Sequence, residues 1–345
     1  MNPSQYTRIV LNERPQKFID SNTFRQETVP FDLKPGQGQV LVKVTWLSLD
    51  PTMRGWLNDT RSYLPPVQIG ETMRAGGLGT VIEVGPGSQL KESDTVFGML
   101  GWREYAVVDE KAVRKIIVPP GSQELDFLGP LGITGMTAYF GLNDVGKLKA
   151  GETLVVSGAA GAVGSIVCQM GKKQGAKVVA IAGSDEKCQW LEKELGVDKA
   201  INYKSPTFRK DFIDAVGYLD VYFDNVGGDI LNLALTRLNK GARIAFCGAI
   251  SDYNSGADEN IKGLTAYMNL ISQRAKLEGF IVLDYAEKFP EAIKEVAGWL
   301  ADGSLKRKFH VVHGLDKAPS ALPMLFTGEN IGKLVIHVSG PDAKL

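Results

Sequence analysis

The chain has 345 residues, 44% of them hydrophobic, which predicts two globular domains and no extended disorder. Lys and Arg together number 39 and Asp and Glu also number 39, so there is no net basic field to attract nucleic acid or an acidic membrane surface. No apolar run could span a bilayer, the polar N-terminus lacks a signal-peptide core, and the three cysteines form neither a metal-type pair nor a disulfide framework, so we expect a soluble cytoplasmic protein.

The first ~130 residues have the pattern of a β domain. In "GQVLVKVTWLSLDP", the side chains of Val40, Val42, Val44 and Trp46 alternate at period two, as in a half-buried strand. "LGTVIEVGPGS" predicts one further strand and "TVFGMLGWREYAVVD" predicts two more. Strands at this spacing predict a compact barrel or sandwich.

From about residue 135, strands alternate with helices. The apolar strand "ETLVVSG" precedes a helix over 161–174 that ends at Gly175, and Ser184 caps a second helix closed by Gly196. Four more buried strands are expected in "KAINY", "LDVYFDNV", "ARIAFCGAI" and "KLEGFIV", with helices in "DILNLALTRLNKG" and "FPEAIKEVAGWLADG". This alternation predicts an α/β domain with a doubly wound parallel sheet. "GENIGKLVIHVSG" predicts a last strand that returns to the first domain.

The turn after "ETLVV" predicts a dinucleotide site. It contains Ala159-x-Gly161-x-x-Gly164, between a strand and an amphipathic helix. Gly161 would let the backbone approach a pyrophosphate, the N–H groups at Ala162 and Val163 would hold it, and Gly164 would let the helix pack on the strand. The alternative is an ordinary tight turn between a strand and a helix.

A second glycine-rich stretch, "GLNDVGKL" at 141–148, resembles a phosphate loop. It ends in Leu148 where a Ser or Thr would bind the metal, and no buried strand precedes it. We therefore expect an ordinary loop there.

The end of the second parallel strand, which "KVVAIAG" predicts after the helix over 161–174, favours NADPH over NADH. An NAD site places a carboxylate there to bind the ribose 2′-OH, whereas this chain has Gly183 and Ser184, which leave room for a 2′-phosphate. Lys187, in the first turn of the next helix, could reach that phosphate. Asp185 argues for NADH, although its position suits a helix start.

Several catalytic devices are missing. All three histidines (His310, His313 and His337) lie near the C-terminus and no cysteine precedes Cys168, so the β domain has neither ligand type for a catalytic zinc, and we predict no metal ligands. There is no Tyr-x-x-x-Lys relay and no G-x-S-x-G elbow. Hydride transfer to an activated C=C bond remains possible, because a conjugated carbonyl takes the charge as an enolate and needs only hydrogen bonds.

The chain resembles the zinc-free, NADPH-dependent double-bond reductases of the medium-chain dehydrogenase/reductase superfamily, which include leukotriene/prostaglandin, plant alkenal and curcumin reductases. The resemblance rests on "LSLDPTMRGW", "GLGTVIEVG", "LGITGMTAYFGL", "SGAAGAVGS", "AGSDEKC", "INYK", "YFDNVGG", "CGAISDYN" and "GENIGKLVI", which occur in this order. It implies a GroES-like β-barrel catalytic domain over 1–133 and 309–345, and a Rossmann NADP-binding domain over 134–308. It also implies a homodimer, in which the apolar stretch near 276–283 could pair with its copy.

The resemblance also implies the roles of individual residues. Lys187 and Tyr203 would hold the 2′-phosphate of NADPH, with Ser184 close by. Tyr253 would hydrogen-bond the substrate oxygen or supply a proton, and Tyr63 would face the substrate. Thr52 stands where many relatives have a pocket tyrosine, so substrate preference should not be copied from a relative. The remaining implied cofactor residues are Met136, Thr137, Asn225, Cys247, Gly248, Ile250, Phe280, Val282 and Asn330.

We therefore expect an NADPH-dependent reductase of α,β-unsaturated aldehydes and ketones, with a small-molecule substrate and no nucleic-acid or membrane partner. Hydride would reach the β-carbon, and the α-carbon would then be protonated through an enolate. The alternatives are a zinc-free quinone reductase, a carbonyl or alcohol dehydrogenase, and a cofactor-binding protein without turnover.

Overall fold

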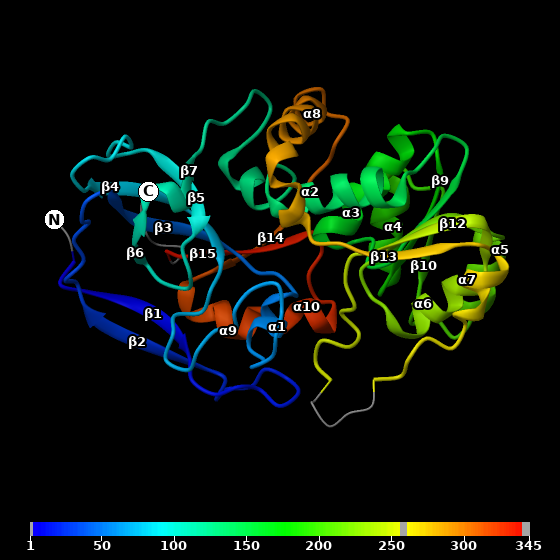
Figure 1. The fold of residues 1–345 in the computed structure, drawn as a ribbon, viewed down its shortest axis with the longest axis horizontal. Coiled ribbons are helices and arrows are strands. Elements are labelled where there is room, and N and C mark those ends of the chain that lie inside the picture. The colour runs from blue at the N-terminus through cyan, green and yellow to red at the C-terminus, as the bar shows by residue number, and fades with distance from the viewer. Residues whose placement is uncertain (1–2, 256–260, 340–345) are drawn as a thin grey trace. The chain divides into compact units, whose positions relative to one another are not determined.

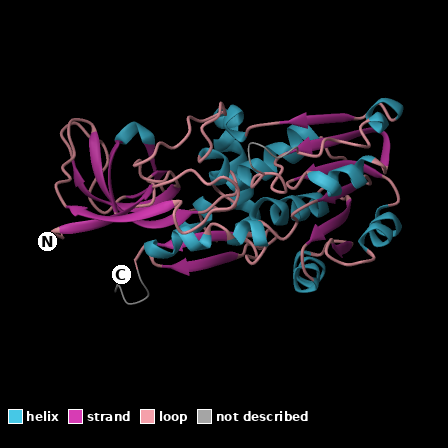
Figure 2. Cartoon of the chain, turned by 90° about the horizontal axis from the view of Figure 1, so that it is seen from below, coloured by secondary structure: helices cyan, strands magenta, loops and turns pink. Residues whose placement is uncertain are grey.

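The computed structural model describes residues 3–255 and 261–339. The chain divides into two compact units, one of Met1–Leu128 with Phe309–Leu345 and the other of Gly129–Lys308. We call the first the β-rich unit and the second the α/β unit; both appear in Figures 1 and 2. Within the two described ranges, no helix is long and apolar enough to cross a membrane.

The β-rich unit is built on a seven-stranded sheet of order β14-β15-β3-β4-β5-β7, with β6 also paired to β3. The C-terminal strand β15 lies antiparallel to β3, which confirms the predicted return of the chain to its first domain. The strands are β3 (Gln39–Ser48), β4 (Gly76–Val84), β5 (Thr95–Met99), β6 (Tyr105–Asp109), β7 (Val113–Lys115), β14 (Phe309–His313) and β15 (Lys333–His337), with a separate antiparallel pair β1 (Gln5–Leu11) and β2 (Phe24–Pro30). The helices are short: α1 (Met53–Trp56), η1 (Glu110–Ala112), η2 (Glu124–Leu128), η5 (Leu315–Lys317), α9 (Ala318–Ala321) and α10 (Met324–Thr327).

The alternation predicted along β3 holds at Lys43, which is exposed between two buried valines, but Leu41 is buried together with Val40 and Val42. Val40, Val42 and Val44 are buried, but Trp46 is half-buried and Leu47 is buried in its place. The pairing of β3 with β4 shifts register between Val44 and Trp46, and an extra residue in one strand exchanges the two faces beyond it. The prediction for Trp46 was therefore wrong, and its ring lies 4.4 Å from that of His337.

The α/β unit contains a six-stranded parallel sheet of order β10-β9-β8-β11-β12-β13. Counted along the chain this order is 3-2-1-4-5-6, that of a dinucleotide-binding Rossmann sheet, which confirms the predicted doubly wound fold. Its strands are β8 (Thr153–Val156), β9 (Lys177–Ala182), β10 (Lys199–Asn202), β11 (Leu219–Asp224), β12 (Leu238–Phe246) and β13 (Lys276–Gly279). Its helices are α2 (Ile133–Phe140), η3 (Gly141–Gly146), α3 (Ala162–Lys173), α4 (Asp185–Leu195), α5 (Phe208–Val216), α6 (Gly228–Leu235), α7 (Met268–Ser272), η4 (Val282–Lys288) and α8 (Phe289–Ala301).

Helices cover both faces of this sheet (Figure 1). Residues of α5 and α6, among them Phe212 and Leu231, share a core cluster with Val155 of β8. On the opposite face α3 packs closely, since a Cβ added to Gly171 would lie 2.5 Å from the side chain of Leu154. Neighbouring strand residues point to opposite faces, so the two helical layers are separate.

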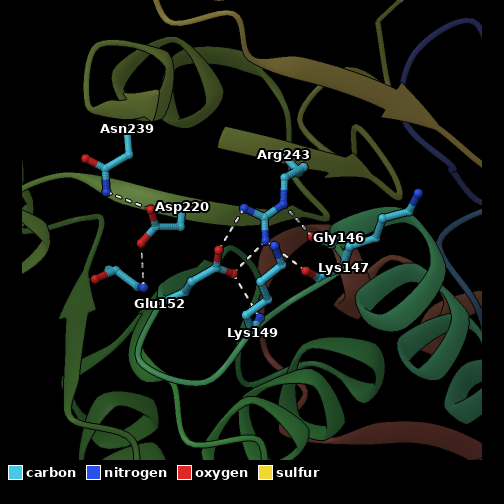
Figure 3. A network of polar contacts seen from close by, with 8 residues as sticks. Gly146, Lys147, Lys149, Glu152, Asp220, Asn239 and Arg243 are labelled. Carbon is cyan, nitrogen blue, oxygen red and sulfur yellow. Dashed lines mark hydrogen bonds and ion pairs between the residues drawn. The ribbon is translucent and has the colours of Figure 1, made fainter. Parts of the chain in front are cut away.

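Two local predictions in this unit were wrong. Residues 141–146 form the π-helix η3 and not a loop, and residues 238–241 begin β12 and do not continue the helix α6. The carbonyls at the end of η3 have a partner distant in sequence: Arg243 donates to Gly146 O at 2.9 Å and to Lys147 O at 2.8 Å, and it pairs with Glu152 (Figure 3). Local sequence patterns contain no sign of such a partner.

Candidate cofactor and substrate site

The glycine-rich turn between β8 and α3 has little room for side chains. A Cβ on Gly164 would lie 2.4 Å from the carbonyl oxygen of Gly158, so only glycine lets α3 start this close to the turn. Gly158 itself has φ +56°, a left-handed conformation that favours glycine. Gly161 caps α3, and a Cβ there would meet only Gly158 O, at 3.1 Å. The first N–H groups of α3, at Ala162 and Val163, belong to a helix N-terminus suited to a pyrophosphate.

The strand order reverses between β8 and β11, and the carboxyl ends of these strands carry a buried polar network. The carboxylate of Asp224 accepts hydrogen bonds from Ser157 Oγ at 2.7 Å, from the Tyr222 hydroxyl at 2.9 Å and from Gly227 N–H at 3.1 Å. Burial raises the pKa of Asp224, although these hydrogen bonds oppose the rise. Ligands of open α/β sheets bind where the strand order reverses. The network therefore fixes the backbone at the place where the cofactor is expected to bind.

The network holds several predicted cofactor residues together. Asn225 Nδ2 donates to Ser157 O at 2.7 Å, and Ile250 N–H donates to Asn225 O at 3.3 Å. The N–H groups of Cys247 and Gly248 both donate to Asp224 O. Sequence reasoning missed Ser157 and Asp224, although a polar residue at the carboxyl end of a buried strand was the available signal.

The thiol of Cys247 is half-buried beside this network. Burial and the nearby charge of Asp224 raise its pKa to about 12. The thiol therefore stays protonated at neutral pH and cannot act as a thiolate nucleophile.

Tyr253 lies on the loop that follows β12. Its hydroxyl oxygen accepts the N–H of Ala249 at 3.3 Å, and a Cβ added to Gly248 would lie 2.9 Å from the same oxygen. The structure thus holds the Tyr253 hydroxyl against the segment that also carries Cys247 and Ile250.

The residues predicted to hold the 2′-phosphate meet at the carboxyl ends of β9 and β10. Ser184 Oγ accepts the N–H of Lys187 at 3.3 Å, and the Tyr203 ring covers Gly183, where a Cβ would lie 3.0 Å from it. Burial, and then the positive charge of Lys204, lowers the pKa of Lys187. Lys204 was missed in the sequence, although it follows Tyr203 directly in "INYK". Two cations beside a helix N-cap suit a phosphate dianion.

Asp185, which argued for NADH, has a different partner. Its Oδ1 accepts a hydrogen bond from Asn202 Nδ2 at 2.8 Å, and it opens helix α4. The carboxylate is thereby tied to the end of β10.

Four other predicted cofactor residues pack within the α/β unit. Met136 is fully buried, Thr137 Oγ1 donates to Ile133 O at 2.8 Å within α2, Phe280 meets the ring of Phe223 edge-on, and Val282 is buried. Their packing is described by the structure, and their contact with a cofactor remains a prediction.

In the β-rich unit, the structure brings Thr52 and Tyr63 together. Their hydroxyl oxygens lie 2.5 Å apart, and Trp56 Nε1 donates to the Tyr63 hydroxyl at 3.4 Å. The guanidinium of Arg74 lies 5.6 Å from the Trp56 ring. Tyr63 is 46% exposed and so available to a ligand. Trp56 and Arg74, which surround Tyr63 here, were not among the predicted site residues.

Asn330 lies in the loop before β15. Its side chain is buried and donates to Gly332 O at 3.0 Å. The buried ammonium of Lys333 donates to Leu49 O at 3.0 Å and pairs with Asp50 at 2.5 Å. Two of the motifs in the sequence, "LSLDP" and "GENIGK", are therefore joined by an ion pair between the buried Lys333 and the half-buried Asp50.

Comparison with known proteins identifies the family. Two domain families match, described as "N-terminal domain of oxidoreductase" over residues 7–116 and "Zinc-binding dehydrogenase" over residues 162–298. YfmJ of Bacillus subtilis is 46% identical over 97% of this chain and 98% of its own length, and the NADPH-dependent curcumin reductase of Escherichia coli is 37% identical over 97% of each chain. The crystal structure of CurA from Vibrio vulnificus in complex with NADPH covers 97% of this chain and 100% of its own, with 36% identity and a TM-score of 0.90.

The chain belongs to the NADPH-dependent double-bond reductases of the medium-chain dehydrogenase/reductase family. The similarity to CurA also confirms the predicted fold class, a β-rich domain joined to a Rossmann domain. One matching domain family has zinc in its description, yet no group of three or more His, Cys, Asp or Glu side chains that could hold a metal occurs in residues 3–255 and 261–339.

Proposed function

We propose that this protein uses NADPH to reduce the C=C bond of α,β-unsaturated aldehydes and ketones. The observation that carries the proposal is similarity along nearly the whole chain to reductases named for curcumin, 2-alkenals and prostaglandins. NADPH is the cofactor, in agreement with the bound NADPH of CurA. The turn at Gly158–Gly164 and the pair Lys187 and Lys204 fit its pyrophosphate and 2′-phosphate, respectively.

The remaining cofactor contacts are proposed by position. Asn225, Cys247, Gly248 and Ile250 lie together at the ends of β11 and β12, where the nicotinamide half of a dinucleotide would reach. Ser184 and Tyr203 would complete the 2′-phosphate site. We assign the remaining contacts with the nicotinamide and its ribose to Met136, Thr137, Phe280, Val282 and Asn330.

Bound NADPH would supply a hydride to the β-carbon of the enone. The chain's part is to orient the substrate and stabilise the charge that develops on its carbonyl oxygen. Tyr253 is the proposed hydrogen-bond donor to that oxygen, because its hydroxyl group carries a proton that it can donate. The α-carbon is then protonated by Tyr253 or by solvent. Thr52 and Tyr63, already joined by their hydroxyl groups, would line the substrate pocket.

The test is to follow oxidation of NADPH and of NADH in parallel with a simple enone, and to identify the product. Preferred use of NADPH with a saturated ketone as product would support the proposal. An allylic alcohol would instead indicate carbonyl reduction, and reduction of quinones alone would indicate a quinone reductase. No turnover with any acceptor would leave a cofactor-binding protein.

We further propose a homodimer formed through β13, in a cytoplasmic protein whose three cysteines are free thiols. β13 is the last strand of the six-stranded sheet, and an uncovered strand edge tends to pair with another chain. The preceding segment, which includes α7, exposes three large apolar side chains, Tyr267 at 53%, Met268 at 60% and Ile271 at 69%. A second copy related by a two-fold axis would cover both the strand edge and these side chains.

A further inference from the structure

Two histidines distant in sequence face each other in the β-rich unit. His313 ends β14 and His337 ends β15, and the parallel pairing of these strands places them directly opposite each other. Their Nδ1 atoms lie 3.4 Å apart, with the rings nearly perpendicular at 84°. Two imidazole nitrogens this close can share a proton, or, when both are deprotonated, a metal ion.

The distance between the two nitrogens matches a metal chelate. Two Zn–N bonds of about 2.0–2.1 Å at a tetrahedral angle separate the nitrogens by about 3.4 Å. We propose that a divalent metal ion of the zinc type binds between Nδ1 of His313 and Nδ1 of His337, with water completing its coordination. We predicted no metal ligands from the sequence, because we looked for a catalytic zinc in the first ~130 residues. The two histidines are 24 residues apart, and only the pairing of β14 with β15 brings them together.

The surroundings of the pair favour this use. His313 is exposed, so an ion and its water ligands can reach the nitrogens, while His337 is half-buried and held by the Trp46 ring at 4.4 Å. A ligand already fixed by packing loses little freedom on binding.

The third histidine provides a matched control. His310 lies on β14, three residues before His313 and opposite Leu334, so its side chain points to the other face of the sheet. A substitution there removes an imidazole from the same strand and leaves the pair intact. The site is separate from the residues assigned to the reductase reaction, so its test does not depend on the proposed function.

The experiment is calorimetric titration of ZnCl2 into the untagged full-length protein at pH 7.5. We expect one ion per chain, an affinity at least tenfold weaker in His313→Gln and in His337→Gln, and an unchanged affinity in His310→Gln. Because His313 is exposed, its variant should fold even if loss of the half-buried His337 disturbs the strand.

A second readout locates the ion. Cu2+ quenches tryptophan fluorescence at short range, and the ring of Trp46 lies 4.4 Å from that of His337. The site would be supported if the quenching saturates and if the variants rank in the same order of affinity as in the zinc titration. The quenching should also be lost in Trp46→Phe. The proposal would be overturned if the unaltered protein binds no zinc, if all variants bind it equally, or if His310→Gln loses the binding.

Discussion

The structure adds Lys204 to the residues that the sequence predicted for the 2′-phosphate site. Its charge acts on Lys187, so both cations can act on one phosphate. Replacing Lys204 by Gln should raise KM for NADPH about tenfold, the loss of about 1.4 kcal/mol of binding, and leave KM for NADH unchanged. Lys210→Gln, at an exposed lysine paired with Asp214, is the control. An unaltered ratio of the two KM values would remove Lys204 from the site.

A substitution of Tyr253 tests the proposed hydrogen-bond or proton donor. Tyr253→Phe keeps the ring but removes the hydroxyl that lies against Gly248 and Ala249. We expect kcat to fall about 100-fold, the usual size of the loss of a positioned acid, with KM for NADPH little changed. Steady-state kinetics with an enone measures both quantities, and a kcat close to that of the unaltered protein would assign the proton to solvent.

Among the elements, the start of α3 depends on a single glycine. Gly164→Ala would push a methyl group to 2.4 Å from Gly158 O, so the helix must move away from the turn. We expect a loss of about 1–3 kcal/mol in the free energy of unfolding, together with weaker NADPH binding. Urea unfolding and NADPH fluorescence measure the two effects. Gly298→Ala, inside α8 with nothing within 4 Å, should instead stabilise by about 0.5–1 kcal/mol.

Arg243 connects β12 with η3, through a hydrogen bond to Gly146 O, and with the residue before β8, through its ion pair with Glu152 (Figure 3). Burial alone would raise the pKa of Glu152, but the hydrogen bonds from Arg243 and from Lys149 N–H more than offset it and lower the pKa below its usual 4.5. Arg243→Met should cost about 1–3 kcal/mol of stability at pH 7. Because the folded-state pKa is the lower one, this contribution is complete above pH 4.5 and is lost as the pH falls through the folded value. Urea unfolding of both proteins from pH 7 to pH 3 measures it, and a difference that does not shrink with acid would contradict the assignment.

At the scale of the whole molecule, the proposed homodimer makes a separate prediction. Ile271→Glu places a charge in the apolar surface beside β13 and should convert the dimer to a monomer, as measured by light scattering after gel filtration. Ile69→Glu changes a comparably exposed side chain in the β-rich unit, at 63% against 69% for Ile271, and should leave the mass unchanged. A monomeric unaltered protein, or equal effects of both substitutions, would refute the proposed interface.

The sequence predicted those parts of the fold and site that depend on neighbouring residues. The cap of Ser184 on α4, the C-terminal glycines Gly175 and Gly196, and the turn at Gly161 are local signals, and the structure has all of them. The prediction failed at Trp46, because a bulge depends on the partner strand.

By itself, the sequence determined the alternation of strands and helices, the glycine turn and the basic residue that favours NADPH, since each depends on residues within a few positions of one another. Only the tertiary structure decided which distant side chains share one place: Ser157 with Asp224, Arg243 with Glu152, and His313 with His337. The order and register of strands set these pairs, and register follows from the packing of the whole sheet, which no short stretch of sequence contains.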